Sequence, residues 1–288
     1  MKFDAFKEQV QKHPFYSFII IAGAIIAFFA NILSNIITIV SFVQKNPITS
    51  VILFIVVIIV AFIIVFSASH FQKRTLLRKI EKLITGISIS MYQDTFGTPT
   101  RKIQNEEKKI RNYLFINAYF FLSVITDMDD TVQCFSVTIR DRTFNPAFKS
   151  PDYPINQPSF RIRLGVTKFC DIPGLPEYVV GCLGARTFSY YETRYLGNPG
   201  HYKDFGFGLN QAGCQPSNLA GYFKVFDTNS PFCPGTSSII EQDLGTLKDF
   251  RTRAIVNSYA VSAPHMRIKE YAGSNLGVSY DEVRMLNI

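Results

Sequence analysis

Two long apolar segments near the N-terminus constrain the fold of this chain more than any other feature of its sequence. Residues 14–44 form a run of 31 residues without a charged side chain, and residues 51–66 are 16 apolar residues in a row. A helix needs about 20 residues to cross a bilayer. A second long span follows the first almost at once, which is not the pattern of a cleaved signal peptide. The sequence therefore predicts a transmembrane helical hairpin over residues 15–69, after a short N-terminal segment, residues 1–14.

The distribution of basic residues predicts the orientation of this hairpin. Lys2, Lys7 and Lys12 precede it, five basic residues follow it between positions 73 and 82, and its tip carries only Lys45. Because positive residues stay on the cytoplasmic side, both termini and the C-terminal part of the chain are expected in the cytoplasm.

The first predicted helix has two chemically distinct faces. At 100 degrees per residue, the small and polar side chains of residues 23–41 fall within one arc of about 140 degrees. They are Gly23, Ala24, Ala27, Ala30, Asn31, Ser34, Asn35, Thr38 and Ser41. The ten other positions are large and apolar. Lipid would leave the amides and hydroxyls unsatisfied, so this face must meet protein or water.

Two interpretations of the polar face compete. Gly23, Ala27 and Ala30 allow close helix packing against the second helix or a dimer mate. Alternatively, several copies of the first helix surround a narrow pore lined by Asn31, Ser34, Asn35, Thr38 and Ser41. The second span is apolar on every side and offers these residues no polar partner, which favours contact between copies in a homo-oligomer, taken here as a tetramer. An uncharged lining predicts weak ion selectivity.

A basic region follows the membrane segments. Residues 70–112 hold ten Lys and Arg against four Asp and Glu, whereas residues 113–288 hold sixteen of each sign. The spacing of apolar residues predicts a basic juxtamembrane helix over 70–85 within a helix-and-linker region, residues 70–111. Its charge is expected to attract anionic lipid head groups. Alternatively, it binds a phosphate-bearing ligand through Arg101, Lys102, Lys108, Lys109 and Arg111.

The remaining residues, 112–288, predict a β-rich cytoplasmic sensor domain. Residues 112–127 and 131–140 form one predicted strand pair around a turn at 127–130, and residues 187–197 and 201–210 form a second around Asn198-Pro199-Gly200. Similar lead-ins from Gly86 and Gly165 indicate an internal duplication. Residues 141–160 and 214–235 read as surface loops. The predicted fold class is thus an α+β membrane protein.

The sequence contains few signs of catalysis. The motifs of zinc proteases, serine hydrolases and P-loop proteins are absent, and the paired G-x-G at Gly206 and Gly208 lacks the third glycine of a dinucleotide site. The acidic turn at 127–130 lacks the glutamate that would complete an EF-hand. Five widely spaced cysteines indicate reduced thiols. We therefore expect neither cofactor nor metal, and no enzyme.

One strand is unusually rich in aromatic and charged groups. Arg186, Tyr190, Tyr191 and Arg194 could hold a base by stacking, as single-strand binding proteins do. Alternation along a half-buried strand explains the same residues without a ligand.

Three stretches carry a resemblance to known proteins. Residues 183–213 (LGARTFSYYETRYLGNPGHYKDFGFGLNQAG), 256–264 (VNSYAVSAP) and 281–286 (DEVRML) resemble a family of uncharacterised bacterial membrane-anchored proteins. In layout, the chain also resembles Hailong-type channel effectors of bacterial antiphage defence. That resemblance implies an inner-membrane channel gated by a nucleotide or DNA oligomer that a partner nucleotidyltransferase makes. The alternative is a non-conducting, membrane-anchored binding module.

Overall fold

The computed structural model describes residues 47–149, 160–174, 176–183, 188–197, 200–214, 244–264, 266–271 and 276–286. The chain divides into two compact units, Met1–Gln72 and Lys73–Ile288. Every residue predicted to line a pore or to pack the first helix, from Gly23 to Ser41, lies outside the described residues.

A long helix, α4, spans Pro47–Ile80. The residues after the second apolar segment are helical as predicted, although the helix ends at Ile80 and not at Thr85. Ten large apolar side chains between Phe54 and Ile64 are 39–71% exposed. In the part of the chain that the structure describes, no helix qualifies by length and apolarity as a membrane span.

The chain beyond α4 is a β-rich α+β fold. After helix α5 (Ile89–Phe96) come strands β1 (Arg101–Asn105), β2 (Ile110–Ile116), β3 (Phe120–Thr126), β4 (Val132–Ile139), β5 (Ala147–Lys149) and β6 (Arg161–Arg163). Then follow the 3₁₀ helix η1 (Phe169–Asp171), β7 (Tyr178–Leu183), β8 (Phe188–Leu196), β9 (Lys203–Leu209), α7 (Leu244–Arg253), β10 (Ser258–Ser262), α8 (Ile268–Tyr271) and α9 (Tyr280–Met285).

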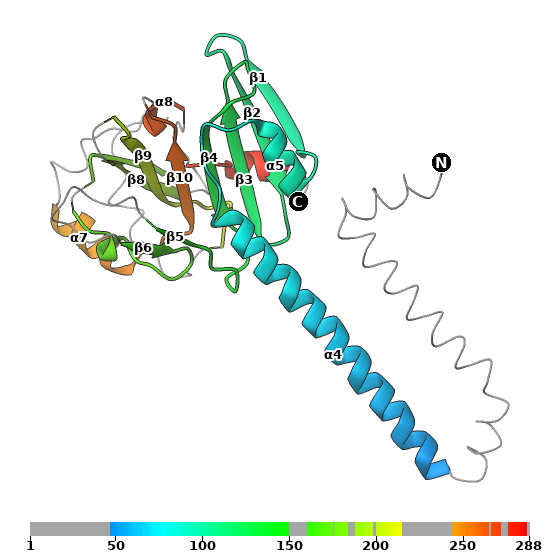
Figure 1. Ribbon diagram of the computed structural model, residues 1–288. Coiled ribbons are helices and arrows are strands. Elements are labelled where there is room, and N and C mark those ends of the chain that lie inside the picture. The colour runs from blue at the N-terminus through cyan, green and yellow to red at the C-terminus, as the bar shows by residue number, and fades with distance from the viewer. Residues whose placement is uncertain are drawn as a thin grey trace, which may run out of the picture. The chain divides into compact units, whose positions relative to one another are not determined.

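Eight of these strands form one antiparallel sheet in the order β1-β2-β3-β4-β10-β9-β8-β7, and β5 pairs with β6 separately. One side of the sheet carries the main core, which α5 covers over β2, β3 and β4 (Figure 1). Helix α7, next to η1, contributes Leu247 and Phe250 to the same core. The other side is covered by α8 and by the segment that leads into α9.

The two halves of the sheet have matching strand pairing. Residues Ser136 of β4 and Ala260 of β10 are paired at the junction of the two halves. Each half begins at a glycine with positive φ, 84° for Gly86 and 77° for Gly165. The amide of Gly86 donates to Val132 O at 2.7 Å, and that of Gly165 donates to Val256 O at 2.8 Å. The similar lead-ins therefore occupy equivalent places in the sheet.

The first half differs from its prediction in two ways. Residues 112–127 are not one strand, because the chain turns between β2 and β3, where the amide of Asn117 donates to Phe120 O at 2.9 Å. The predicted linker also contains α5 and β1. Strand β1 is rich in charge because it lies at the edge of the sheet, where charged side chains remain in water. The predicted hairpin of β8 and β9 is confirmed.

The end of α4 is fixed in the core of the sheet domain. Ile80 is fully buried, and Leu76, Leu77 and Leu83 pack against the same core. The last turn tightens, with the amide of Leu83 donating to Ile80 O at 3.2 Å. The carbonyl of Ile84 then accepts a hydrogen bond from the Tyr92 hydroxyl at 2.7 Å. Core packing and this bond end the helix before the position that the sequence alone predicts.

Candidate functional site

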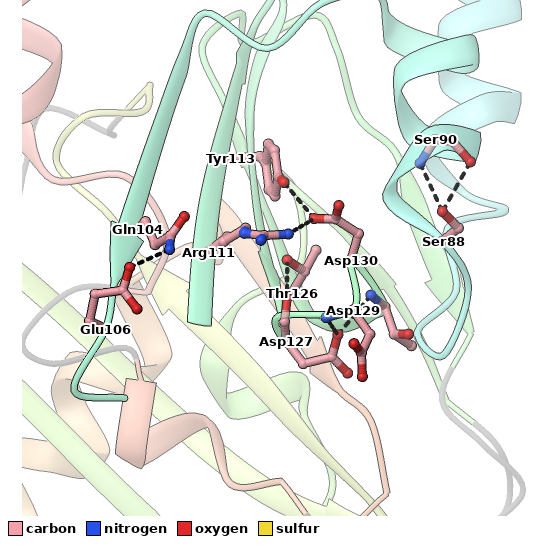
Figure 2. A network of polar contacts seen from close by, with 11 residues as sticks. Ser88, Ser90, Gln104, Glu106, Arg111, Tyr113, Thr126, Asp127, Asp129 and Asp130 are labelled. Carbon is pink, nitrogen blue, oxygen red and sulfur yellow. Dashed lines mark hydrogen bonds and ion pairs between the residues drawn. The ribbon is translucent and has the colours of Figure 1, made fainter. Parts of the chain in front are cut away.

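A polar cluster lies where β2 meets the turn between β3 and β4. Arg111 and Tyr113 are two residues apart on β2 and therefore point to the same side of the sheet. The Arg111 guanidinium donates to Asp130 Oδ1 at 2.7 Å, and the Tyr113 hydroxyl donates to the same oxygen at 2.7 Å (Figure 2). One carboxylate oxygen is thus shared between two donors. We call Lys102, Arg111, Tyr113 and Asp130 the Arg111 cluster.

The turn that carries Asp130 is held by side-chain hydrogen bonds. Asp127 Oδ1 accepts from the amides of Asp129 at 3.0 Å and Thr131 at 2.9 Å, and its other oxygen accepts from the Gln133 amide group at 2.6 Å. Asp130 has a positive φ of 61°. The predicted hairpin turn at 127–130 is confirmed, since β3 and β4 pair on either side of it.

The charged groups of the Arg111 cluster influence one another. Lys102 on β1 places its ammonium group 5.2 Å from the centre of the Tyr113 ring. The Tyr113 hydrogen bond, followed by Arg111, lowers the pKa of Asp130, and the bond to Asp130 raises the pKa of Arg111. Two cations therefore face a single ionised carboxylate. Arg111 Nε is buried and has no hydrogen-bond acceptor.

The other basic residues predicted to bind a ligand have different surroundings. Arg101 forms an ion pair of 3.3 Å with Glu282 of α9. Lys108 donates to Glu270 O at 3.0 Å, and Lys109 lies in the tight β1–β2 turn with a φ of 52°. Arg186 lies outside the described residues. Among these five predicted residues, Lys102 and Arg111 are thus the two that lower the pKa of Asp130.

The aromatic and charged residues of β8 are buried. Tyr190, Tyr191 and Arg194 are 1%, 0% and 2% exposed, and Tyr191 packs on the opposite side of the sheet from the other two. Stacking of a base on these rings would first require the core to open. The alternation along β8 is that of a buried strand.

Tyr190 and Arg194 belong to a buried ionic network centred on Glu192 of the same strand. The Tyr190 hydroxyl donates to Glu192 Oε1 at 2.6 Å, and Arg194 Nη2 lies 3.2 Å from Glu192 Oε2. Arg251 Nε of α7 lies 2.8 Å from Glu192 Oε1. This contact is an ion pair and not a hydrogen bond, because the N–H group is not directed at the oxygen. Sequence reasoning missed Glu192 and Arg251 as partners, because the packing of α7 on β8 has no local signal.

The opposite side of the sheet explains the paired glycines of β9. A Cβ on Gly206 would lie 2.8 Å from the side chain of Leu276, and one on Gly208 would lie 3.0 Å from it. The glycines thus make room for the C-terminal segment. A pocket next to Leu276 is lined by both polar and apolar residues of β2, β3 and β4 and by Tyr271.

The described residues contain no group of three or more His, Cys, Asp or Glu side chains that could hold a metal ion. Cys134, Cys170 and Cys214 are free thiols. Comparisons with protein-family models, with curated proteins and with solved structures found no match. The fold therefore defines the protein only as a β-rich α+β protein with a large antiparallel sheet.

Proposed function

We propose that the protein is a homo-oligomeric inner-membrane channel or pore-forming effector whose cytoplasmic sheet domain binds a nucleotide or oligonucleotide. The observation that carries this proposal is the complete segregation of small and polar side chains on one face of residues 23–41. The following apolar segment offers that face no hydrogen-bonding partner, so copies of the first helix would supply it. The resemblance in layout to antiphage effectors supports a role in bacterial defence.

The structure of α4 adds support for coupling between membrane and sensor. Helix α4 contains the apolar residues 51–66 and, at its C-terminal end, Ile80, which is buried in the core of the unit Lys73–Ile288. The exposed apolar side chains between Phe54 and Ile64 would be stabilised by lipid, at about 25 cal/mol per Å² of apolar surface removed from water. A ligand that repositions the core around Ile80 would therefore act directly on this helix.

The test is ion leakage through the purified protein in liposomes. Asn31→Leu combined with Asn35→Leu should insert normally and lose conductance, because the polar lining is replaced by apolar side chains. A matched control, Ile32→Leu with Ile36→Leu, adds the same residue on the large apolar face and should conduct like the wild type. Insertion with unchanged leakage in the Asn variant would refute the pore.

A non-conducting anchored binding module is the second candidate. It is favoured by the compactness of Lys73–Ile288 as a unit of its own. On this hypothesis a soluble fragment that starts at Lys73 would retain all function, and planar bilayers would show no conductance.

The matching strand pairing of the two halves also supports an internal duplication. In the first half the amide of Ile89 donates to Asp130 O, and in the second the amide of Phe169 donates to Ala254 O. We infer that both halves descend from one ancestral four-stranded unit. The buried network around Glu192 and the Arg111 cluster then occupy related places that have diverged.

A further inference from the structure

We propose that Lys102 and Arg111 bind the phosphate group of a ligand, and that Asp130 is an internal carboxylate which this phosphate displaces. Only the consequence for gating rests on the proposed channel function. The binding site itself rests on the geometry of the Arg111 cluster.

The first argument is the unused hydrogen-bonding capacity of Arg111. Its Nη1 contacts Asp130, whereas its Nε is buried without an acceptor. A guanidinium presents donors in a planar fork that fits a carboxylate or a phosphate with two parallel bonds. Asp130 Oδ1 serves both Arg111 and Tyr113, so this carboxylate satisfies the fork only in part. A phosphate has enough oxygens to meet the Arg111 fork, Tyr113 and Lys102 together.

The second argument is the balance of charge and exposure. The side chains of Arg111 and Asp130 are 19% and 41% exposed, so solvent reaches the pair. Lys102 has no ion-pair partner among the residues whose contacts the structure describes, and it lies near enough to Asp130 to lower the pKa of that carboxyl. Asp127 and Asp129 lie on the same turn, but Asp130 is the carboxylate that contacts Arg111. A phosphate would offer Arg111 and Lys102 more acceptor oxygens than Asp130 alone.

The third argument comes from the equivalent place in the other half of the sheet. In the first half, Tyr113 of β2 pairs with Val124 of β3, which pairs with Phe135 of β4. In the second half, Glu192 of β8 pairs with Phe207 of β9, which pairs with Tyr259 of β10. Glu192 therefore has the position in its half that Tyr113 has in the first. There Glu192 is fully buried between two arginines, Arg194 and Arg251. In that half the Glu192 carboxylate is the anion, and moving it away would leave buried charge without a partner. The Arg111 cluster is the open, half-exposed counterpart.

Displacement of the Asp130 side chain would affect the end of α4 through backbone hydrogen bonds. The carbonyl of Asp130 accepts from the amide of Ile89, and the amide of Val132 donates to Ile87 O. Ile87 lies in the connection between α4 and α5, and Ile89 is the first residue of α5. A ligand that draws Arg111 away from Asp130 therefore favours a different position of the turn and of this connection, which is the differential binding that a switch requires.

The test measures binding of inorganic pyrophosphate to the full chain in lipid nanodiscs. Arg111→Gln should weaken binding about tenfold, the effect expected when a charge-assisted hydrogen bond is lost. Asp130→Asn should tighten binding several-fold, because asparagine tolerates the positive φ and keeps a hydrogen-bond acceptor but no longer competes as an anion. Arg253→Gln removes an exposed charge on α7 and should bind pyrophosphate like the wild type.

The opposite signs of the two changes separate a ligand site from a structural ion pair. A purely structural pair would make both variants less stable without tightening binding in either. Affinity in Asp130→Asn equal to or weaker than that of the wild type overturns the proposal, as does unchanged affinity in Arg111→Gln. Because the Asp130 variant must gain affinity, a folding defect in the Arg111 variant cannot produce the expected result.

Two further arms identify the source of the phosphate and separate this site from the channel. If lipid head groups occupy the site, nanodiscs containing phosphatidylserine will weaken pyrophosphate binding to the wild type relative to phosphatidylcholine alone. If the ligand is a soluble phosphate compound, both discs will give the same affinity, and either result supports the site. Conductance is recorded separately, so a protein that binds pyrophosphate as predicted but never conducts contradicts the channel and keeps the site.

Discussion

Replacing Glu192 with glutamine should destabilise the sheet domain strongly. The carboxylate is fully buried, and the side chains of its partners Arg194 and Arg251 are 2% and 15% exposed. Glutamine keeps the shape of the side chain but leaves the buried Arg194 guanidinium and the largely buried Arg251 side chain without their counter-charge. Removing one member of a buried ion pair costs about 3 to 5 kcal/mol.

That loss is large compared with the total stability of a domain, about 5 to 15 kcal/mol. For a domain of about 200 residues, 1 kcal/mol shifts the melting temperature by about 2 to 4 °C. We therefore expect Glu192→Gln to lower Tm by roughly 6 to 20 °C.

The assay is thermal unfolding of the full chain, followed by the near-ultraviolet circular dichroism of its tyrosines. Glu177→Gln is the matched control, because it makes the same chemical change in an ion pair with Arg267 whose glutamate side chain is 49% exposed. An exposed pair contributes only about 0 to 1 kcal/mol. Equal melting temperatures for the two variants would refute the assignment of a buried network.

Two further predictions follow from burial and charge. Burial, with a smaller contribution from Asp204, raises the pKa of Cys134 to about 12, and this thiol is 6% exposed. Iodoacetamide should therefore label the exposed Cys170 in the native protein and Cys134 only after unfolding. Mass spectrometry measures the labelling of each cysteine. Fast labelling of Cys134 in the native protein would contradict the prediction. The pKa of Asp130 is lowered, mainly by the Tyr113 hydrogen bond. The ionised Asp130 carboxylate therefore stabilises the folded protein above the ordinary carboxyl pKa. This stabilisation is lost as the pH falls through the lowered pKa of the folded state. The difference in denaturation midpoint between wild type and Asp130→Asn should accordingly be constant near neutral pH and shrink below about pH 4, and a difference that is independent of pH down to about 2 would disprove the ionic role.

Local patterns were sufficient to predict some elements of the fold. The hairpin of β8 and β9 follows from alternation on both sides of an Asn-Pro-Gly turn, and the turn after β3 follows from its cluster of acidic residues. The continuation of α4 beyond the apolar segment follows from apolar residues at helical spacing. In each case the signal and the structure lie within a few residues of each other.

Other features depend on contacts between distant residues and could not be predicted in this way. The sequence places the residues of β1 in a linker, because the exposed edge of a sheet selects charged residues that also suit a loop. The role of Gly206 becomes clear only when Leu276 is placed against it. The sequence groups the basic residues between Arg101 and Arg111 together, although Arg101 pairs with α9 and Arg111 pairs with the turn at Asp130.

The central claim is that the polar face of residues 23–41 surrounds a water-filled axis shared by several copies of the chain. Its most direct test is the accessibility of single cysteines introduced into a cysteine-free protein whose conductance is measured in a planar bilayer. A charged, water-soluble thiol reagent should alter the current with cysteine in place of Asn31, Asn35 or Thr38, and leave it unchanged with cysteine in place of Ile32, Ile36 or Ile39. Equal responses from both faces, or a protein that carries no current at all, would contradict the account.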